Sequence, residues 1–363
     1  MTAPLALASF TPRPSGDTPF VSVLLAVRNE ERHICAALDA VRAQDWPRDR
    51  MEILVADGCS TDATRALVER VAARDPRVVL LDNPERFVAQ GLNRALQAAR
   101  GEVIVRVDGH CRIPPGYVRA GVEALASGTL ACAGGPVRAL GETAVARTIA
   151  LAMSTPFGVG GASFRWSREA CDVDHLPFGV WPRRVFERIG GFDEALVRNQ
   201  DDEFSDRLRR AGGVIRLLPE QLVDYWSRGT LGGLWRQYLG YGFWKVRVIR
   251  KRGGWPSSPR HLVPAAFVLG MAAGPLAAAL THTALAAFAV PALYAAFLAA
   301  ATVVTWLTRG DSACALMPVA LPVMHTAYGV GFLAALVTGH DSETRVPRIA
   351  ARHSEPLGER SAA

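Results

Sequence analysis

The chain has 363 residues, of which 50% are hydrophobic, and a formal net charge of +7 at pH 7. This length allows one large domain or two modest ones. The six cysteines form no C-x-x-C pair, which argues against a zinc ribbon or a disulfide framework and favours a reducing compartment. The clearest basic run, residues 245–252, directly precedes an apolar region, so its charge is typical of a membrane surface and we expect no nucleic-acid partner. The N-terminus lacks the basic region of a signal peptide, and we expect the polar part of the chain to stay in the cytoplasm.

The first hundred residues alternate between apolar, β-rich runs and helical patterns. Strands are expected at residues 21–27, 51–56, 78–81 and 103–107, with a further strand at 214–218. Ser60 or Thr61 is expected to cap the helix after the second strand. This alternation predicts βαβ units and a mostly parallel sheet flanked by helices. Asp57 and Asp108 follow the second and fourth strands, at the sheet edge where open α/β folds bind ligands.

An acidic stretch at residues 197–207 holds four carboxylates between apolar residues. Phe204 and Leu208 recur at helical spacing, so these acids are expected at a helix start, where the helix dipole favours negative charge. A glycine-rich turn at residues 189–194 precedes the stretch and allows close approach of the backbone to a ligand. An N-capping cluster on a solvated helix would also explain an isolated acidic group.

Residues 131–191 are less regular and rich in glycine. Within them, residues 157–162 superficially resemble a dinucleotide-binding loop. They do not follow a clear strand, so we interpret them as an acceptor-binding or lid segment.

The sequence divides into five parts by composition. Charge is frequent up to about Arg260 and then vanishes until Arg309. We expect a flexible N-terminus at 1–17, a catalytic domain at 18–228, an amphipathic interfacial segment at 229–258, a transmembrane region at 259–339 and a polar tail at 340–363. The transmembrane region holds three apolar stretches of membrane-spanning length, about 262–280, 284–307 and 313–338. The short link at 281–283 leaves a re-entrant hairpin open as an alternative for the first two.

Taken together, the motifs resemble those of the inverting family 2 glycosyltransferases with the GT-A fold, and most closely the branch of succinoglycan-biosynthesis enzymes. The resemblance covers roughly residues 18–255. It rests on Val23-Leu-Leu-Ala-Val-Arg-Asn-Glu-Glu31, Ala56-Asp-Gly-Cys-Ser-Thr-Asp62, Val107-Asp-Gly-His110, Pro177-Phe-Gly-Val-Trp181, Gly190-Gly-Phe-Asp193, Arg198-Asn-Gln-Asp-Asp-Glu203 and Gln237-Tyr-Leu-Gly-Tyr-Gly-Phe-Trp-Lys245. Each motif is weak by itself, but their order and spacing are specific.

The resemblance implies a nucleotide-sugar site. Asp108 matches the first acid of the family's D-x-D motif and is expected to hold Mg²⁺ or Mn²⁺ with the donor diphosphate. His110 replaces the second acid, and it either binds the metal, which would favour Mn²⁺, or donates a hydrogen bond to phosphate. Asp57 matches the acid that accepts a hydrogen bond from uracil. Arg28, Asn29 and Glu30 are expected to shape the same pocket.

The catalytic base and the acceptor site are also implied by the resemblance. The base aligns with Asp201, and Asp202 is the competing candidate. Gln200 stands where the family usually has Glu. An ionised Asp can take the proton of the acceptor hydroxyl. Acceptor binding is assigned to three residues: Trp181, Gln237 and Lys245.

The sequence therefore predicts an inverting hexosyltransferase with a UDP-sugar donor and a divalent metal. The acceptor would be a polyprenyl-diphosphate-linked saccharide of bacterial exopolysaccharide synthesis. The enzyme is expected in the bacterial cytoplasmic membrane, as a multi-pass protein with a cytoplasmic catalytic domain and other polysaccharide-assembly proteins as possible partners. Two alternatives stay open: a polyprenyl-phosphate-sugar synthase, and a non-catalytic subunit that binds a nucleotide sugar.

Overall fold

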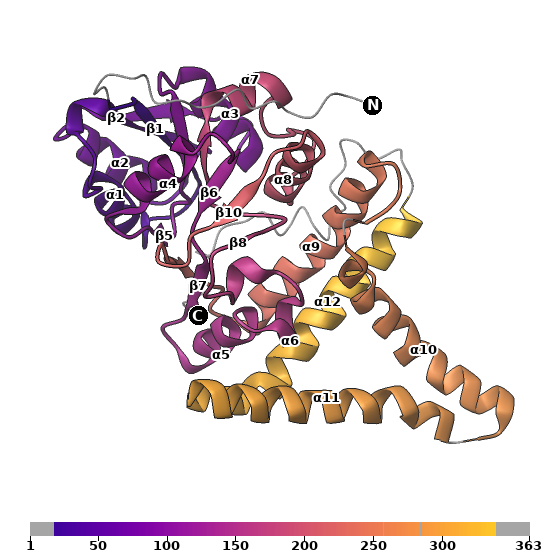
Figure 1. Cartoon of the computed structure of the whole chain (residues 1–363). Helices are drawn as coiled ribbons and strands as arrows, with labels where there is room; N and C mark the ends of the chain where they lie inside the picture. Colours follow the sequence, from indigo (N-terminus) through magenta and orange to yellow (C-terminus); the bar gives the residue numbers. More distant parts are fainter. Residues whose placement is uncertain (1–17, 257, 284, 339–363) are drawn as a thin grey trace. The chain divides into compact units, whose positions relative to one another are not determined.

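The computed structural model describes residues 18–338 except 257 and 284, so the expected N-terminal segment and polar tail lie outside the described residues. The described chain forms two compact units (Figure 1). One comprises residues 18–138 and 166–225, and the other comprises residues 139–165 and 226–338. The predicted catalytic domain, 18–228, thus includes a segment that the structure groups with the C-terminal helices.

The first unit is built on an eight-stranded sheet of order β3-β2-β1-β4-β9-β6-β10-β8. Its strands are β1 (Val21–Val27), β2 (Met51–Asp57), β3 (Val78–Asp82), β4 (Val103–Arg106), β6 (Cys132–Gly134), β8 (Cys171–Asp172), β9 (Val180–Pro182) and β10 (Ile215–Leu217). Its helices are α1 (Ile34–Arg42), α2 (Thr64–Ala72), α3 (Val88–Ala98), α4 (Tyr117–Ala126), α7 (Arg183–Ile189) and α8 (Gln200–Arg210). A small second sheet has the order β5-β11-β7, with β5 (Cys111–Arg112), β11 (Val223–Trp226) and β7 (Val137–Leu140).

The predicted mostly parallel sheet is confirmed. Strands β3, β2, β1 and β4 are all parallel, and β6 is parallel to β10. Strands β1, β2 and β4 are mostly apolar and are covered on both faces, and Leu24, Ile53 and Ile104 are fully buried. Strand β9 was not predicted. It lies antiparallel between β4 and β6, and its three residues are too few to show a periodic pattern.

Helix α3 packs unusually close to the sheet through Gly91. A methyl group at this position would lie 2.9 Å from the Cβ atom of Ala26. Small residues on both sides therefore let the helix approach β1, and Leu92 and Ala95 of the same helix are buried. This contact fixes α3, whose Asn93 reaches the functional site described below.

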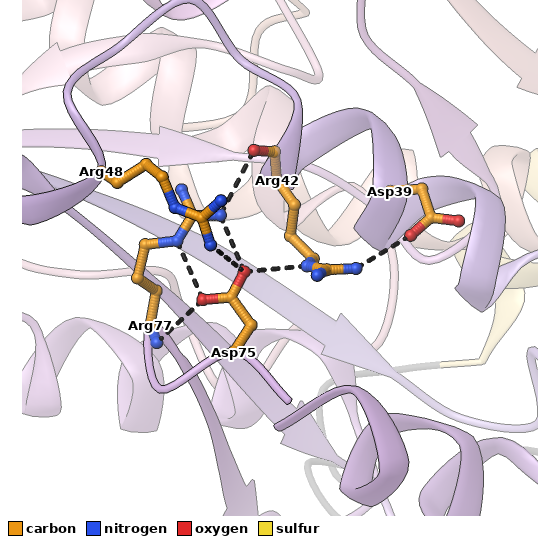
Figure 2. Close-up of polar contacts among 5 residues, drawn as sticks. All are labelled: Asp39, Arg42, Arg48, Asp75 and Arg77. Carbon is orange, nitrogen blue, oxygen red and sulfur yellow. Dashed lines mark hydrogen bonds and ion pairs between the residues drawn. The ribbon is translucent and has the colours of Figure 1, made fainter. Parts of the chain in front are cut away.

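A buried carboxylate, Asp75, ties the ends of α1 and β3 together (Figure 2). Its oxygens accept hydrogen bonds from Arg77 Nη2 at 2.7 Å, Arg77 Nε at 2.9 Å and Arg42 Nε at 2.9 Å. Its side chain is fully buried, whereas Arg48, a third cation 3.5 Å away, is mostly exposed. The hydrogen bonds from Arg77 hold the pKa of the Asp75 carboxyl well below its ordinary value.

We expect Asp75→Asn to lower the free energy of unfolding by about 3 kcal/mol, because removing one partner of a buried ion pair leaves the other charge uncompensated. The measurement is urea unfolding of the detergent-solubilised chain, followed by tryptophan fluorescence. Asp39→Asn is the matched control. Asp39 also pairs with Arg42, at 3.1 Å, but its side chain is 69% exposed, so less than about 1 kcal/mol should be lost.

The same pair gives a pH test of this prediction. A lowered folded-state pKa contributes stability above the unfolded-state pKa of about 3.9, and that stability is lost as pH falls through the folded-state value. The stability difference between the parent chain and Asp75→Asn should therefore be constant from about pH 7 to 5 and shrink below about pH 4. An equal difference at pH 7 and pH 3 would contradict the assignment of the stabilising charge to Asp75.

The second unit is helical. Its elements are α5 (Ala144–Met153), α6 (Pro156–Val159), α9 (Leu231–Lys251), α10 (Val263–Thr281), α11 (Leu285–Arg309) and α12 (Met317–Val337). Residues 157–162, expected to form an acceptor-binding or lid segment, cover part of α6 and a turn at Gly160, which has φ 58°. Among the described residues, three helices are long and apolar enough to cross a membrane, as predicted from length and composition. Helices α10 and α11 leave most of their apolar surface exposed, which suits a lipid environment.

Helices α9 and α12 pack closely through glycines. A methyl group on Gly242 would collide with the carbonyl oxygen of Tyr328, and one on Gly331 with that of Leu239. Such close contact between small residues is a common way to join helices in a membrane protein. The face of α9 that the sequence predicted for the membrane interface is thus partly covered by protein: Leu234 is fully buried, whereas Trp235 is 37% exposed.

Candidate active site

The carboxyl ends of β1 and β2 lie at one edge of the sheet, where the register pairs Val27 with Asp57. The loops that follow them are joined by reciprocal hydrogen bonds. Asn29 Nδ2 donates to Thr61 Oγ1 at 3.0 Å, and Thr61 N donates to Asn29 Oδ1 at 2.7 Å. Asn29 has the left-handed φ of 55°, which asparagine tolerates better than most residues. Two of the predicted nucleotide-site residues, Asn29 and Asp57, are therefore brought to one place.

Asp57 is 1% exposed and receives its hydrogen bonds from its own loop. Ser60 Oγ donates to Asp57 Oδ1 at 2.5 Å, and Ser60 N donates to Oδ2 at 3.2 Å. The prediction that Ser60 or Thr61 caps α2 is wrong, because both side chains are used within this loop junction and α2 has no side-chain cap at Ala63. The role of Asp57 toward uracil stays a prediction.

Arg28 lies beside the same junction. Its Cβ atom is 3.3 Å from the position of a methyl group on Gly58, so the two loops nearly touch there. Its Nε atom is buried without a hydrogen-bond partner in the described part of the chain. Arg28 is therefore a half-buried cation whose Nε–H is available to a ligand, which suits the predicted anionic diphosphate.

Glu30 and His110 form a second pair at this edge. Glu30 Oε1 lies 2.8 Å from His110 Nδ1, and the His110 ring packs edge-on against Tyr225 at 4.8 Å between centroids. A histidine that gives one ring nitrogen to a carboxylate presents the other to a metal or phosphate in a fixed orientation. The contact explains how Glu30, which the sequence assigned only to the pocket, fits the predicted site.

Asp108 is held by Arg106, two residues earlier on β4. Arg106 donates from Nε and Nη2 to Asp108 Oδ1, at 3.2 and 3.1 Å. Within residues 18–338, no three His, Cys, Asp or Glu side chains are grouped to hold a metal. Metal binding by the Asp108 carboxylate and the His110 imidazole stays a prediction.

Asp201 lies in the first turn of α8, as the sequence predicted for the acidic stretch. It is the second residue of the helix, where its charge is favoured by the helix dipole. Its Oδ2 atom lies 3.6 Å from His175 Nε2 and 4.0 Å from Arg106 Nη1. Its Oδ1 atom accepts a hydrogen bond from Asp202 N at 2.9 Å. The side chain is 24% exposed, so it is both anchored and accessible.

Two other acids of the helix, Glu203 and Asp206, have arginine partners one turn later. Glu203 lies 2.9 Å from Arg207, and Asp206 lies 3.1 Å from Arg210. These pairs have the i, i+4 spacing of neighbouring side chains on one helix face. Asp201 instead faces side chains from β4 and from the loop before β9, which separates it from the structural acids of α8.

The glycine-rich turn at Gly190 and Gly191 is held from two sides. Arg207 donates from Nη2 to the carbonyl oxygen of Gly191 at 2.7 Å and from Nη1 to that of Ile189. Asn93 of α3 donates to Phe192 O and accepts from Phe192 N, both at 2.8 Å. The turn is therefore tied to both α8 and α3.

The predicted acceptor residues have different surroundings. Trp181 is 3% exposed in β9 and packs edge-on against Phe186 and Phe204, so it supports the start of α8 from the core. Gln237 and Lys245 belong to α9 of the second unit and are 3% and 6% exposed. Gln237 Nε2 donates to Tyr241 OH at 3.0 Å. Acceptor binding by all three stays a prediction.

Two residues of the site were missed by the sequence reasoning, Arg106 and His175. Arg106 had a signal, since it is a charged residue within an otherwise apolar strand and is 4% exposed. Burial by itself would lower the pKa of Arg106, but the charges of Asp108 and Asp201 raise it above its ordinary value, so Arg106 is a permanent cation. His175 carries no comparable signal in the sequence.

Comparisons with known proteins identify the family of this chain. A sequence model described as "Glycosyl transferase family 2" matches residues 22–177. The succinoglycan biosynthesis protein ExoA of Rhizobium meliloti (strain 1021) is 31% identical over 315 residues, which cover 85% of this chain and 93% of the relative. A dolichyl N-acetyl-alpha-D-glucosaminyl phosphate 3-beta-D-2,3-diacetamido-2,3-dideoxy-beta-D-glucuronosyltransferase of Methanococcus voltae is 25% identical over 240 residues, which cover 64% of this chain and 74% of the relative.

Among solved structures, the mannosyltransferase PcManGT from Pyrobaculum calidifontis, in complex with GDP-Man and Mn²⁺, aligns with a TM-score of 0.54 at 22% identity. The alignment covers 89% of each chain and shows that the GT-A fold is shared. The sequence similarity extends over nearly the whole of a relative at 31% identity. The chain is therefore a glycosyltransferase with the GT-A fold and belongs to glycosyl transferase family 2.

Proposed function

We propose that this enzyme transfers one hexose, with inversion, from a UDP-sugar to a lipid-linked saccharide in bacterial exopolysaccharide synthesis. The observation that carries the proposal is the position of Asp201. A partly exposed carboxylate at a helix start, facing Arg106 and His175, suits a general base better than a helix-surface acid. The name of the relative in Rhizobium supports the pathway.

The donor end of the proposed reaction uses the loops at the ends of β1, β2 and β4. Asp57 and Asn29 would bind the base and ribose side of the nucleotide, with Arg28 as a nearby cation. Asp108 and His110 would hold Mn²⁺ or Mg²⁺, with Glu30 orienting the His110 ring. A divalent metal supplies positive charge that stabilises the departing diphosphate.

At the acceptor end, Asp201 would take the proton of the attacking hydroxyl. The new bond joins the acceptor oxygen to the anomeric carbon, while the bond from that carbon to the UDP oxygen breaks and UDP leaves with the electron pair. Attack from the face opposite the leaving group turns an α-linked donor into a β-glycoside. Asp202 remains the runner-up for the base, because it is the neighbouring acid of the same helix turn.

A lipid-linked acceptor is supported by the second unit. Helices α10, α11 and α12 have the length and composition of membrane spans, and a chain anchored in a bilayer would meet substrates that are carried on lipids there. The archaeal relative is named for a dolichyl-phosphate-linked substrate. Trp181, Gln237 and Lys245 stay the proposed acceptor residues, and the proposed location is a bacterial cytoplasmic membrane with the catalytic unit on its cytoplasmic side.

The testing experiment combines purified enzyme in detergent with a panel of nucleotide sugars and prenyl-diphosphate-linked saccharides. A β-linked, acid-stable glycoside is the expected product. An acid-labile sugar phosphate formed on a prenyl phosphate would instead identify a polyprenyl-phosphate-sugar synthase. Binding of a UDP-sugar with no acceptor-dependent release of UDP would identify a non-catalytic binding subunit.

The basic run 245–252 supports a further prediction about the lipid diphosphate. Arg247 packs over the Trp244 ring at 5.0 Å, and Arg250 donates to the carbonyl oxygen of Leu336 at 3.2 Å. Reversing the charge of Arg247, Arg250 and Lys251 together should raise the KM for the lipid acceptor at least about tenfold, since each cation near an anionic lipid surface contributes about 1 kcal/mol. The KM for the UDP-sugar should not change.

The control for this prediction is the amount of triple variant that inserts into membranes, compared with the parent chain. If a correctly inserted variant keeps its KM for the lipid acceptor, the run orients the protein in the membrane and does not bind the head group.

A further inference from the structure

Arg106 stands between the two carboxylates that the proposed reaction uses at its two ends. Its Nε and Nη2 atoms contact Asp108 Oδ1, and its Nη1 atom lies 4.0 Å from Asp201 Oδ2. The guanidinium is 5% exposed and lies over the Phe192 ring at 5.9 Å. The buried cation of Arg106 therefore contacts both Asp108, the acid of the proposed donor site, and Asp201, the acid of the proposed acceptor site.

The three nitrogens of this guanidinium are not equally used. Nε and Nη2 donate hydrogen bonds, whereas Nη1 is buried without a hydrogen-bond partner in the part of the chain that the structure describes. A distance of 4.0 Å to Asp201 is an ion-pair contact but too long for a hydrogen bond. Leaving a charged donor unpaired in a buried place costs free energy, so closing this gap by about 1 Å would be favourable.

From this geometry we propose that Arg106 is a positioning residue for Asp201, and that it completes a hydrogen bond to Asp201 when a donor complex engages Asp108. This inference rests on the proposed role of Asp201 as the base. Nη1 already has a donor that no described residue uses, and a metal–diphosphate complex on Asp108 would compete with Arg106 for that carboxylate and leave the guanidinium free to shift toward Asp201. The base is held in place by the same event that fills the donor site.

The alternative is that Arg106 only supports the fold. A buried arginine bonded to a carboxylate can stabilise a protein without any effect on catalysis, and Arg77, bonded to Asp75, is another buried arginine of the same unit. Arg77 precedes β3, whereas the candidate site lies beyond the carboxyl ends of the strands. Arg77→Gln is therefore a matched control for loss of a buried cation.

The test is a double-mutant cycle on turnover and on donor binding. Turnover is the release of UDP with the donor and lipid acceptor that the panel selects, and donor binding is the calorimetric titration of UDP with Mn²⁺. We expect Arg106→Gln to lower kcat about 10–100-fold, the effect of one charge-assisted hydrogen bond, and to change UDP affinity less than about threefold. In the Asp201→Asn background the same substitution should lower kcat less than about threefold, because its target is already absent.

Arg106→Lys provides a second variant if Arg106→Gln does not fold. Lysine keeps the positive charge but lacks the planar guanidinium with its several donors. We therefore expect lysine to keep the ion pair with Asp108 and to lose the contact with Asp201. UDP affinity should again change less than about threefold, while kcat falls about tenfold. Arg77→Gln should lower the unfolding temperature and leave kcat of the folded enzyme unchanged.

Three outcomes would overturn the proposal. An equal fall of kcat in the parent and Asp201→Asn backgrounds would mean that Arg106 acts independently of Asp201. A loss of UDP affinity with kcat unchanged would mean that Arg106 serves Asp108 alone. A parent chain that binds UDP but shows no turnover would overturn the function proposed above together with this inference, which distinguishes that failure from the first two.

Discussion

Asp201→Asn is expected to lower kcat by about 10²–10⁴-fold, the usual effect of removing a general base. Asparagine keeps the shape of the side chain but cannot accept the proton of the acceptor hydroxyl. The contacts of this carboxylate in the described part of the chain include Arg106 and His175, whereas the loops at Asn29 and Asp57 are proposed to bind the nucleotide. UDP affinity should therefore change less than about threefold, because ground-state donor binding does not need the base. The measurements are kcat by UDP release and UDP affinity by calorimetry.

Asp202→Asn is the matched control for this prediction. Both acids lie in the first turn of α8, so the two substitutions remove the same charge at nearly the same place in the helix dipole. We expect Asp202→Asn to keep kcat within about fivefold of the parent chain, as for a residue that takes no part in proton transfer. An inactive Asp202→Asn beside an active Asp201→Asn would move the base by one residue.

Asp108→Ala is expected to abolish turnover and to lower the metal-dependent affinity for UDP at least about 100-fold. Asp108 is the carboxylate in the candidate metal site, where His110 is the other protein donor. Two protein ligands are few for a hard cation, so losing the charged one removes most of the protein's hold on the metal. The measurement is the calorimetric titration of UDP with and without Mn²⁺.

Asp57→Asn distinguishes loss of the metal from general damage to the pocket. Asp57 is bonded within the loop at the end of β2 and contacts Ser60, so its proposed role lies with the nucleotide base. Its substitution should weaken UDP binding by the same factor with and without Mn²⁺. The contrary result would be full activity of the parent enzyme in excess chelator, with the same UDP affinity in the presence and absence of Mn²⁺. That result would show that Asp108 is not a metal ligand.

Much of the fold could be predicted because its signals are local. The apolar runs at residues 21–27 and 51–57 are covered on both faces and could be recognised without knowing what covers them. The acidic stretch ending at Arg207 shows helical spacing over two turns, which fixed the start of α8 near Gln200. The apolar helices were recognisable for the same reason, since membrane-spanning length is a property of one continuous segment.

The remaining features depend on contacts between distant residues. Strand β9 has three residues and shows no period of its own, so only pairing with β4 and β6 defines it. Ser60 is a residue type that often caps helices, but its hydroxyl instead donates to the Asp57 carboxylate and accepts a hydrogen bond from the backbone N–H of Asn29. At this position, tertiary hydrogen bonds outweigh the local tendency of serine to cap a helix.

The amino-acid sequence by itself determined the family, the parallel sheet and the apolar helices, and it supplied the candidate acids of the site, because each shows as a short pattern of residue types. Only the tertiary structure decided what surrounds those acids. Arg106 and Asp201 are 95 positions apart, and His175 lies between them in sequence on a different element. Charges act through space, and the chain brings these three together only after α8 docks against the sheet. The candidate acids could thus be read from the sequence, whereas the cation that links them could be identified only in the folded protein.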